Sequence, residues 1–148
     1  MTRSPSDEGM RWLNQARADL LAVQTLLDGG RFDTACFLSQ QSAEKTLKAY
    51  LYLCGEEMVL GHSVAKLCDL AAEYDGRFGD LKKEIKNLDQ FYIEARYPNG
   101  LPDSFPAEFY QRSDAQWAIE AAQRAADLVE ALWSTSGTPG NKQPDNNK

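Results

Sequence analysis

The chain has 148 residues, of which 43% are hydrophobic and 26% charged, with a formal net charge of −6 at pH 7. These values fit one globular domain with its own core, and the negative charge argues against a protein that coats nucleic acid through its overall field, though not against a local basic site. No apolar run approaches the roughly 18 residues that span a bilayer, and residues 1–10 lack the apolar segment of a secretion signal, so we expect a cytoplasmic protein with no membrane contact.

The first predicted helix begins after a flexible N-terminus at residues 1–6 and is capped by Ser6 or Asp7. Gly29 and Gly30 end it and allow a tight reversal of the chain. Two long helices joined so briefly should lie antiparallel. The apolar face of this helix recurs at steps of three and four residues: Leu13, Ala16, Leu20, Val23 and Leu27.

The second predicted helix, from Phe32 to about Cys54, contains no Pro or Gly and is small or apolar over most of its circumference. Such a helix is expected at the centre of a fold. Its polar side chains fall within a sector of about 100°: Gln41, Glu44, Lys45 and Lys48. A concentrated polar sector on a buried helix suggests a functional site, and the alternative is an ordinary Glu44–Lys48 pair one helical turn apart.

Two further helices should precede an irregular segment. Ser63 is expected to cap a short third helix, and a fourth should run from about Phe78 to Arg96. Residues 97–110 contain three prolines and four aromatic residues, which is long for a helix connection. The inward face predicted for the fourth helix consists of Leu81, Ile85, Leu88, Tyr92 and Ala95.

The last predicted helix begins at a capping box formed by Ser113 and Gln116 and runs to about Trp133. Residues 134–148 lack periodicity and are expected to form a disordered tail. The helical domain would therefore cover residues 7–133. With no strand-like alternation, the sequence predicts an all-α fold: an up-and-down four-helix bundle with an additional short helix.

Few residues are candidates for a catalytic, metal-binding or cofactor-binding role. The chain has no phosphate-binding glycine loop, no HExxH or GxSxG motif and no zinc-spaced Cys/His set, so we expect neither a metal nor a cofactor. Cys36, Cys54 and Cys68 form no CxxC pair and are expected to be reduced thiols packed in the core. His62, the one histidine, is a candidate catalytic residue, with helix capping or solvent exposure as the alternative.

Three segments in order carry a family resemblance: QQSAEKTLKAYLYLCG, GHSVAKL and LDQFYIEARYPNG. Together they resemble the HEPN domain family, over about residues 10–133. The resemblance implies a helical bundle that usually forms a homodimer and often pairs with a small nucleotidyltransferase in toxin–antitoxin modules. Some members of that family are metal-independent endoribonucleases, and others bind nucleotides or RNA.

The ribonuclease members carry an arginine followed, four to six residues later, by a histidine. Arg96 matches the arginine, but residues 100–102 read Gly-Leu-Pro, so the histidine is missing. RNA cleavage through the 2′-hydroxyl needs a proton acceptor and donor, which arginine does not supply near neutral pH. The resemblance therefore implies a binding module more than an enzyme.

The sequence thus predicts an anion site in which Arg96 holds a phosphate and Tyr97 offers a ring to a base. Lys45, Lys48 and Glu44 would adjust the charge of this site from the central helix. The alternative is a structural role in which Arg96 is ion-paired with Glu44 or Asp89. Two other functions stay open. One is an endoribonuclease toxin that uses either His62 or a site assembled by two subunits. The other is a subunit that recognises protein alone.

Overall fold

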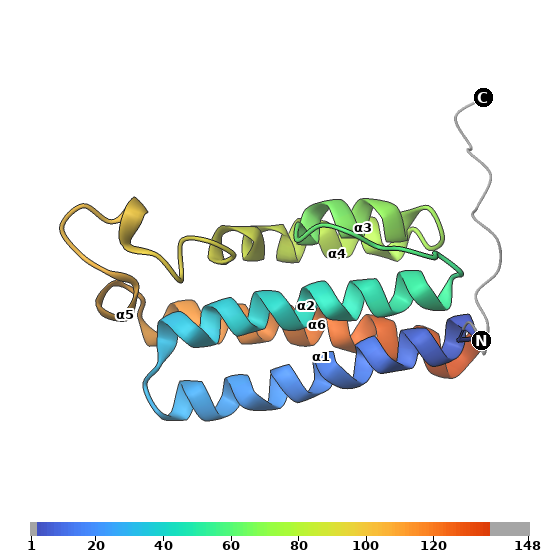
Figure 1. Ribbon diagram of the computed structural model, residues 1–148, viewed down its shortest axis with the longest axis horizontal. Coiled ribbons are helices and arrows are strands. Elements are labelled where there is room, and N and C mark those ends of the chain that lie inside the picture. The colour runs from blue at the N-terminus through green and yellow to red at the C-terminus, as the bar shows by residue number, and fades with distance from the viewer. Residues whose placement is uncertain (1–2, 137–148) are drawn as a thin grey trace.

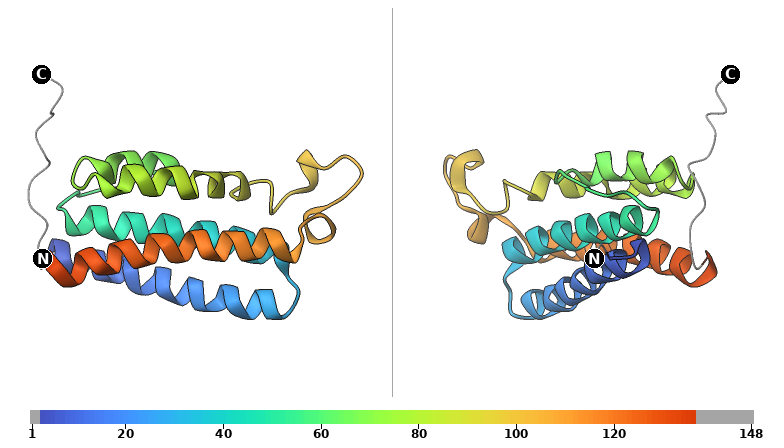
Figure 2. Two further views of the ribbon diagram at one scale, coloured as in Figure 1. Left: turned by 180° about the vertical axis from the view of Figure 1, so that it is seen from behind. Right: turned by 45° about the vertical axis from the view of Figure 1, so that its right-hand side comes forward.

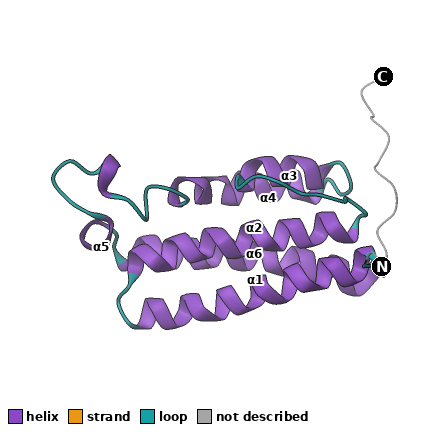
Figure 3. Cartoon of the chain, viewed as in Figure 1, coloured by secondary structure: helices purple, strands orange, loops and turns teal. Residues whose placement is uncertain are grey.

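The computed structural model describes residues 3–136, and all of its regular structure is helical. The all-α prediction is confirmed: the described residues contain no strand (Figures 1 and 3). None of the helices within 3–136 has both the length and the apolar character that crossing a membrane requires. The elements are α1 (Pro5–Asp28), α2 (Phe32–Leu53), α3 (Val64–Ala72), α4 (Arg77–Ile85), the 3₁₀ helices η1 (Lys86–Phe91) and η2 (Pro98–Gly100), α5 (Pro106–Phe109) and α6 (Arg112–Ser136).

The central position predicted for α2 is confirmed. It packs against α1 and α6 on one side and against α3 and η1 on the other (Figures 1 and 2). The stripe of small residues along it is almost completely buried, which allows the neighbouring backbones to approach closely. That stripe consists of Ala35, Ser39, Ser42, Thr46 and Ala49.

α1 begins earlier than the sequence suggested. Ser4, and neither Ser6 nor Asp7, is the N-cap: its hydroxyl oxygen accepts a hydrogen bond from the Asp7 backbone N–H at 3.1 Å. Pro5 fits the first helical position because its missing N–H would have no partner there. At the other end, Gly30 takes a φ of 75°, a conformation that favours glycine and permits the short reversal into α2.

The fourth helix is not continuous, contrary to the prediction of one helix from Phe78 to Arg96. α4 ends at Ile85 and continues as the 3₁₀ helix η1, followed by turns. A 3₁₀ helix has three residues per turn, so residues three apart share a face. Ile85, Leu88 and Phe91 are accordingly all buried, and Phe91 takes the inward place that helical spacing had assigned to Tyr92, which is only half-buried.

The segment from η1 to α6 extends beyond the end of the bundle that holds the α1–α2 turn (Figures 1 and 2). α6 begins at Arg112, so the predicted cap at Ser113 is wrong. Asp114, in the first turn of α6, instead reaches back and accepts a hydrogen bond from the Gln111 backbone N–H at 2.8 Å, just before the helix begins. α6 continues to Ser136 rather than Trp133. Most of the predicted disordered tail, residues 137–148, and residues 1–2 of the predicted flexible N-terminus lie outside the described residues.

Candidate functional site

One stripe of α2 carries the polar residues of the candidate site. Gln40, Glu44 and Lys48 follow one another at four-residue steps, so they lie on one face of the helix. All three are buried. Phe37 precedes them on the same face. The polar sector predicted from the sequence is therefore partly enclosed by neighbouring elements, and its charges must be satisfied within the protein.

Glu44 is a buried carboxylate with three polar neighbours. Its Oε2 lies 3.3 Å from Nζ of Lys48, and its Oε1 accepts a hydrogen bond from Nε2 of Gln40 at 3.4 Å. Oε1 also lies 3.1 Å from Nδ1 of His62. The predicted Glu44–Lys48 pair is thus present. It forms one part of a buried network in which a cation compensates the carboxylate.

His62 is held in place although its ring is half exposed. Its side chain has an exposed fraction of 54%, while its backbone carbonyl accepts a hydrogen bond from Nε2 of Gln40 at 2.9 Å. The imidazole stacks on the ring of Tyr92, with centroids 4.6 Å apart and planes inclined by 15°. Ser63, the next residue, caps α3 as predicted. His62 itself therefore has a carboxylate partner and a stacking partner and is not a helix cap.

Arg96 lies at the surface on three aromatic rings. Its Cζ is 4.4 Å from the ring centroid of Phe37, 4.8 Å from that of Tyr92 and 5.2 Å from that of Tyr97. Its Nε donates a hydrogen bond to the Tyr92 backbone carbonyl at 2.6 Å. Within residues 3–136 no carboxylate pairs with this guanidinium, and its two terminal nitrogens make no hydrogen bond. The rings fix its plane and leave those donors facing outward.

The alternative role for Arg96, an ion pair with Glu44 or Asp89, is wrong for this structure because both carboxylates are used elsewhere. Glu44 binds Lys48 and His62. Asp89 accepts hydrogen bonds from the backbone N–H groups of Val64 and Ala65, at 2.6 and 3.2 Å, and from the Ser63 hydroxyl at 2.8 Å.

The structure does not bring Lys45 and Lys48 to Arg96. They follow Phe37, which Arg96 contacts, by eight and eleven residues, or about 12 and 16 Å along the helix axis. Nζ of Lys45 pairs with Oδ2 of Asp19 at 2.6 Å. Nζ of Lys48, besides binding Glu44, lies 5.6 Å from the ring centroid of Trp12. Both lysines therefore neutralise carboxylates within the bundle.

Sequence reasoning missed two partners of this site. Asp19 was not singled out, although it lies between Ala16 and Val23 on the buried face of α1, and a charge at such a position signals a buried ion pair. Phe37 was also missed, since nothing in the sequence distinguishes it from other half-buried aromatic residues. Tyr97 lies where predicted, next to Arg96, with 48% of its surface exposed.

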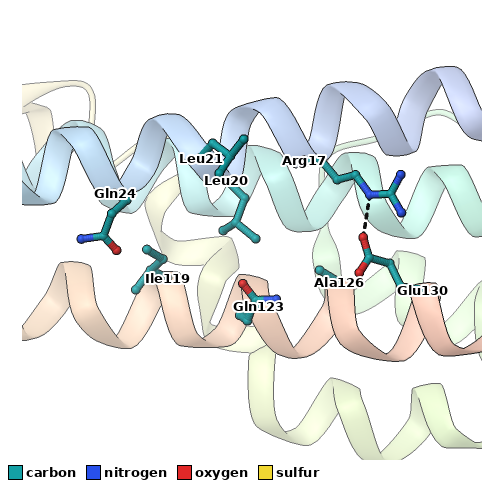
Figure 4. Close-up of a pocket in the computed structure, with 8 residues that line it drawn as sticks. All are labelled: Arg17, Leu20, Leu21, Gln24, Ile119, Gln123, Ala126 and Glu130. Carbon is teal, nitrogen blue, oxygen red and sulfur yellow. Dashed lines mark hydrogen bonds and ion pairs between the residues drawn. The ribbon is translucent and has the colours of Figure 1, made fainter.

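A hollow of about 470 Å³ lies elsewhere, between α1 and α6 (Figure 4). It is lined by Leu20, Leu21 and Ile119, and its charged side chains, Arg17 and Glu130, bind each other at 2.6 Å. The lining of this hollow is therefore mainly apolar. Nor do residues 3–136 contain a cluster of three His, Cys, Asp or Glu side chains placed to hold a metal ion.

Comparison with known proteins gives consistent matches. The family model described as "HEPN domain" matches residues 10–132. A relative from Methanocaldococcus jannaschii, MJ1304, whose name presents it as a candidate toxin, is 24% identical over 126 residues, which cover 80% of this chain and 83% of that protein.

Two solved structures are similar in both sequence and shape. TT1696 from Thermus thermophilus is 37% identical with a TM-score of 0.76, over 83% of this chain and 96% of that one. ST0689, described as an archaeal HEPN homologue, is 32% identical with a TM-score of 0.70, over 89% and 98%. The helical arrangement described above is therefore shared with known structures.

Proposed function

The chain belongs to the HEPN domain family, and from this premise we propose that it is a binding module for a nucleotide or RNA phosphate, with Arg96 as the anion-binding residue. The observation that carries the proposal is the exposed guanidinium of Arg96, fixed on three aromatic rings and free of any carboxylate partner within residues 3–136. A planar guanidinium with free donors suits a phosphate, which it can bind through two parallel hydrogen bonds.

The second element of the proposed site is a ring for the base. Tyr97 lies against Arg96 and is half exposed, and an unstacked base of single-stranded RNA can stack on such a ring. Pro98 fixes the backbone after it, which shapes the rim. The protein as a whole carries a charge of −6. A long polyanion would therefore meet repulsion away from the site, so we expect the protein to contact only one or two phosphates of a short ligand.

The proposal also covers the protein partners of the module. We propose that it forms a homodimer and pairs with a nucleotidyltransferase in a toxin–antitoxin-like module in the cytoplasm. The support is the family resemblance, together with the name of the relative MJ1304. Copurification of tagged protein with the product of the adjacent gene, followed by determination of its mass in solution, tests both parts.

Binding can be tested by fluorescence anisotropy with a labelled single-stranded RNA of about ten nucleotides, and by calorimetry with ATP and GTP. Arg96→Ala should raise Kd at least tenfold, since a charged hydrogen-bonding group is lost. Arg112→Ala is the matched control, because Arg112 also lies on an aromatic ring, at 5.0 Å from that of Phe32. Equal affinity of the Arg96 and Arg112 variants would remove Arg96 from the site.

A second candidate function, recognition of protein alone, is favoured by the projecting segment. Four large hydrophobic side chains there are about half exposed: Ile93, Tyr97, Phe105 and Phe109. Exposed apolar residues gathered in one segment are typical of a protein contact. If this function is correct, wild type should not bind RNA, and substitution of Phe105 and Phe109 by serine should abolish copurification of a partner.

A further inference from the structure

α1 and α6 leave an open groove between them. Both helices pack on α2, and the hollow of about 470 Å³ lies where α1 and α6 face each other (Figure 4). Its lining runs from Arg17 to Gln24 along α1 and from Ile119 to Glu130 along α6. At 1.5 Å per residue these stretches are about 10 and 16 Å long. The groove can therefore accommodate about two to three turns of a further helix.

The groove is apolar, and one large apolar side chain stands at its edge. Leu20 and Ile119 line it and are half-buried. Leu21, which also lines it, is 76% exposed. The exposed residues that share a face of α1 with Leu21 carry no charge: Asn14, Ala18 and Thr25. An uncharged helix face with a leucine in water beside an apolar groove is typical of a protein contact.

The edge of the groove on α6 is acidic. Gln123 lines the groove, and Glu120 and Asp127 lie three residues before it and four residues after it, so all three share one face of the helix. All three side chains are exposed. Nε2 of Gln123 donates a hydrogen bond to Oδ1 of Asp127 at 2.8 Å, which holds that carboxylate at the edge.

The edge on α1 adds a further carboxylate and no free cation. Nε2 of Gln24, in the lining, donates a hydrogen bond to Oδ1 of Asp28 at 2.9 Å. Arg17 is the one basic side chain among the described residues that line the groove, and Glu130 neutralises it at 2.6 Å. The groove therefore presents an apolar floor between negatively charged edges.

Shape and charge together select the occupant. A small molecule would keep one side in water, whereas ligand sites usually bury most of the ligand. A second copy of this chain would bring the same carboxylates face to face, because a two-fold interface pairs one patch with itself. A helix with apolar residues on one face and Lys or Arg beside them meets neither objection. Such a helix packs against two others at the usual separation of about 8–10 Å.

We infer that the groove between α1 and α6 binds an amphipathic helix of a protein partner, with apolar side chains against Leu20, Leu21 and Ile119 and with Lys or Arg facing Glu120 and Asp127. The inference rests on the proposed function, in that the module pairs with a second protein. It gives that partnership a surface and a chemistry, and it is independent of phosphate binding at Arg96.

Fluorescence anisotropy with synthetic helices tests the groove on the full chain. The first probe is a labelled peptide of about 15 residues with leucines at steps of three and four and lysines beside them, and the second carries glutamates instead of lysines. Wild type should bind the lysine peptide at least tenfold more tightly. Leu21→Lys should raise that Kd at least tenfold. Leu60→Lys is the matched control, because Leu60 is 75% exposed and lies between α2 and α3. Its Kd should change less than threefold.

Reversal of the edge charges separates the groove from the overall charge of the protein. Glu120→Lys with Asp127→Lys should weaken binding of the lysine peptide and strengthen binding of the glutamate peptide, each by about tenfold. Glu57→Lys with Asp103→Lys makes the same change in net charge at exposed positions outside the groove, and the lysine peptide should stay the tighter ligand. Equal effects of the two double variants would overturn the inference, and so would equal effects of Leu21→Lys and Leu60→Lys. Circular dichroism melts check the fold of every variant.

Crosslinking identifies what occupies the groove in the complex with the copurified partner. A photo-crosslinking residue in place of Gln123 should react with a partner segment that has apolar residues at helical spacing and Lys or Arg beside them, as mass spectrometry can determine. Crosslinks to a second copy of this chain, or to an acidic segment, would overturn the inference.

The outcomes keep the two proposals apart. A partner that copurifies equally well with wild type and Leu21→Lys would leave the proposed partnership standing and overturn the role of the groove. If no partner copurifies with wild type, the partnership is rejected, and the peptide results decide the groove by themselves. Arg96→Ala should change neither peptide binding nor copurification, since Arg96 lies outside the groove.

Discussion

The carboxylate of Asp89 lies 2.6 Å from the backbone nitrogen of Val64, so a side chain of η1 caps the first turn of α3. The same carboxylate binds the Ala65 N–H and the Ser63 hydroxyl. The first N–H groups of a helix have no partner within it, and a negative charge is favourable at that end. Asp89 therefore fixes the start of α3, and with it His62, one residue before the cap.

We predict that Asp89→Ala lowers the free energy of unfolding by about 2 kcal/mol, because it removes a charged cap and leaves half-buried N–H groups unpaired. Urea denaturation followed by circular dichroism measures this. Asp80→Ala is the control. The Asp80 side chain is 86% exposed, and its ion pair with Lys83 is long, at 3.9 Å, so its removal should change the free energy of unfolding by no more than about 0.5 kcal/mol. Equal effects of the two substitutions would contradict the capping role.

Gly9 lies where α1 closely approaches both α2 and α6. A Cβ atom at this position would lie 2.6 Å from the Trp133 ring and 2.8 Å from the Ala49 backbone oxygen. We predict that Gly9→Ala destabilises the protein by about 1–3 kcal/mol, since the backbone of α2 cannot yield without disturbing the core.

Gly79 provides the matched control for this substitution. It lies inside α4, and a Cβ there would meet nothing within 4 Å. Gly79→Ala should therefore stabilise the protein by about 0.5–1 kcal/mol through the higher helix propensity of alanine. Thermal unfolding of the two variants should shift in opposite directions from wild type. A shift in the same direction would show that the contact at Gly9 is relieved at little cost.

Lys48 is the buried counter-ion of Glu44, with exposed side-chain fractions of 7% and 4%. Lys48→Met should cost about 3 kcal/mol of unfolding free energy, because it leaves a buried carboxylate without its nearest cation. The double variant Lys48→Met with Glu44→Gln should recover most of that loss, since no unpaired charge then stays buried.

The exposed Lys83 supplies the reference for this cycle. Its side chain is 81% exposed, and Lys83→Met should change stability by less than about 0.5 kcal/mol. If the double variant were less stable than Lys48→Met alone, the destabilising effects of the two substitutions would be additive. This result would contradict the role of Lys48 as the counter-ion of Glu44.

The features that were predictable from the sequence depend on local periodicity. The burial of α2 and its polar sector follow from which residues recur at helical spacing, and so does the antiparallel pairing across Gly29 and Gly30. The 3₁₀ geometry of η1 was not predictable, because Leu88 fits both a period of 3.6 and a period of three. A period of 3.6 places Tyr92 on the inward face, whereas a period of three places Phe91 there.

The contacts of the candidate site were not predictable for a different reason. Arg96 could be singled out by its place before the irregular segment, and Glu44 by its place on a buried helix. That Glu44 meets His62 depends on the path of residues 54–63 back along α2, which no periodicity determines. Stacking of His62 on Tyr92 depends in turn on the break between α4 and η1.

The buried thiols give the protein a defined response to alkaline pH. Burial raises the pKa of Cys36 to about 12 and that of Cys68 to about 12, from an ordinary value near 9. Between these values the unfolded chain has lost the two protons while the folded protein keeps them. The folded state is thus favoured fully below about pH 9, and its advantage is lost as pH rises toward 12.

We therefore predict that the free energy of unfolding falls between pH 9 and 11, with a slope of up to about 1.4 kcal/mol per pH unit for each thiol. Urea denaturation at half-unit intervals of pH measures the slope. In the variant Cys36→Ala with Cys68→Ala, no thiol titrates at these positions, so the decline should be shallower over pH 9–10, before the tyrosines add to it. The pKa of Tyr110, raised to about 12 mainly by burial, makes that later contribution in both proteins. A slope that is identical in wild type and variant below pH 10 would show that the two thiols do not titrate differently in the folded and unfolded states.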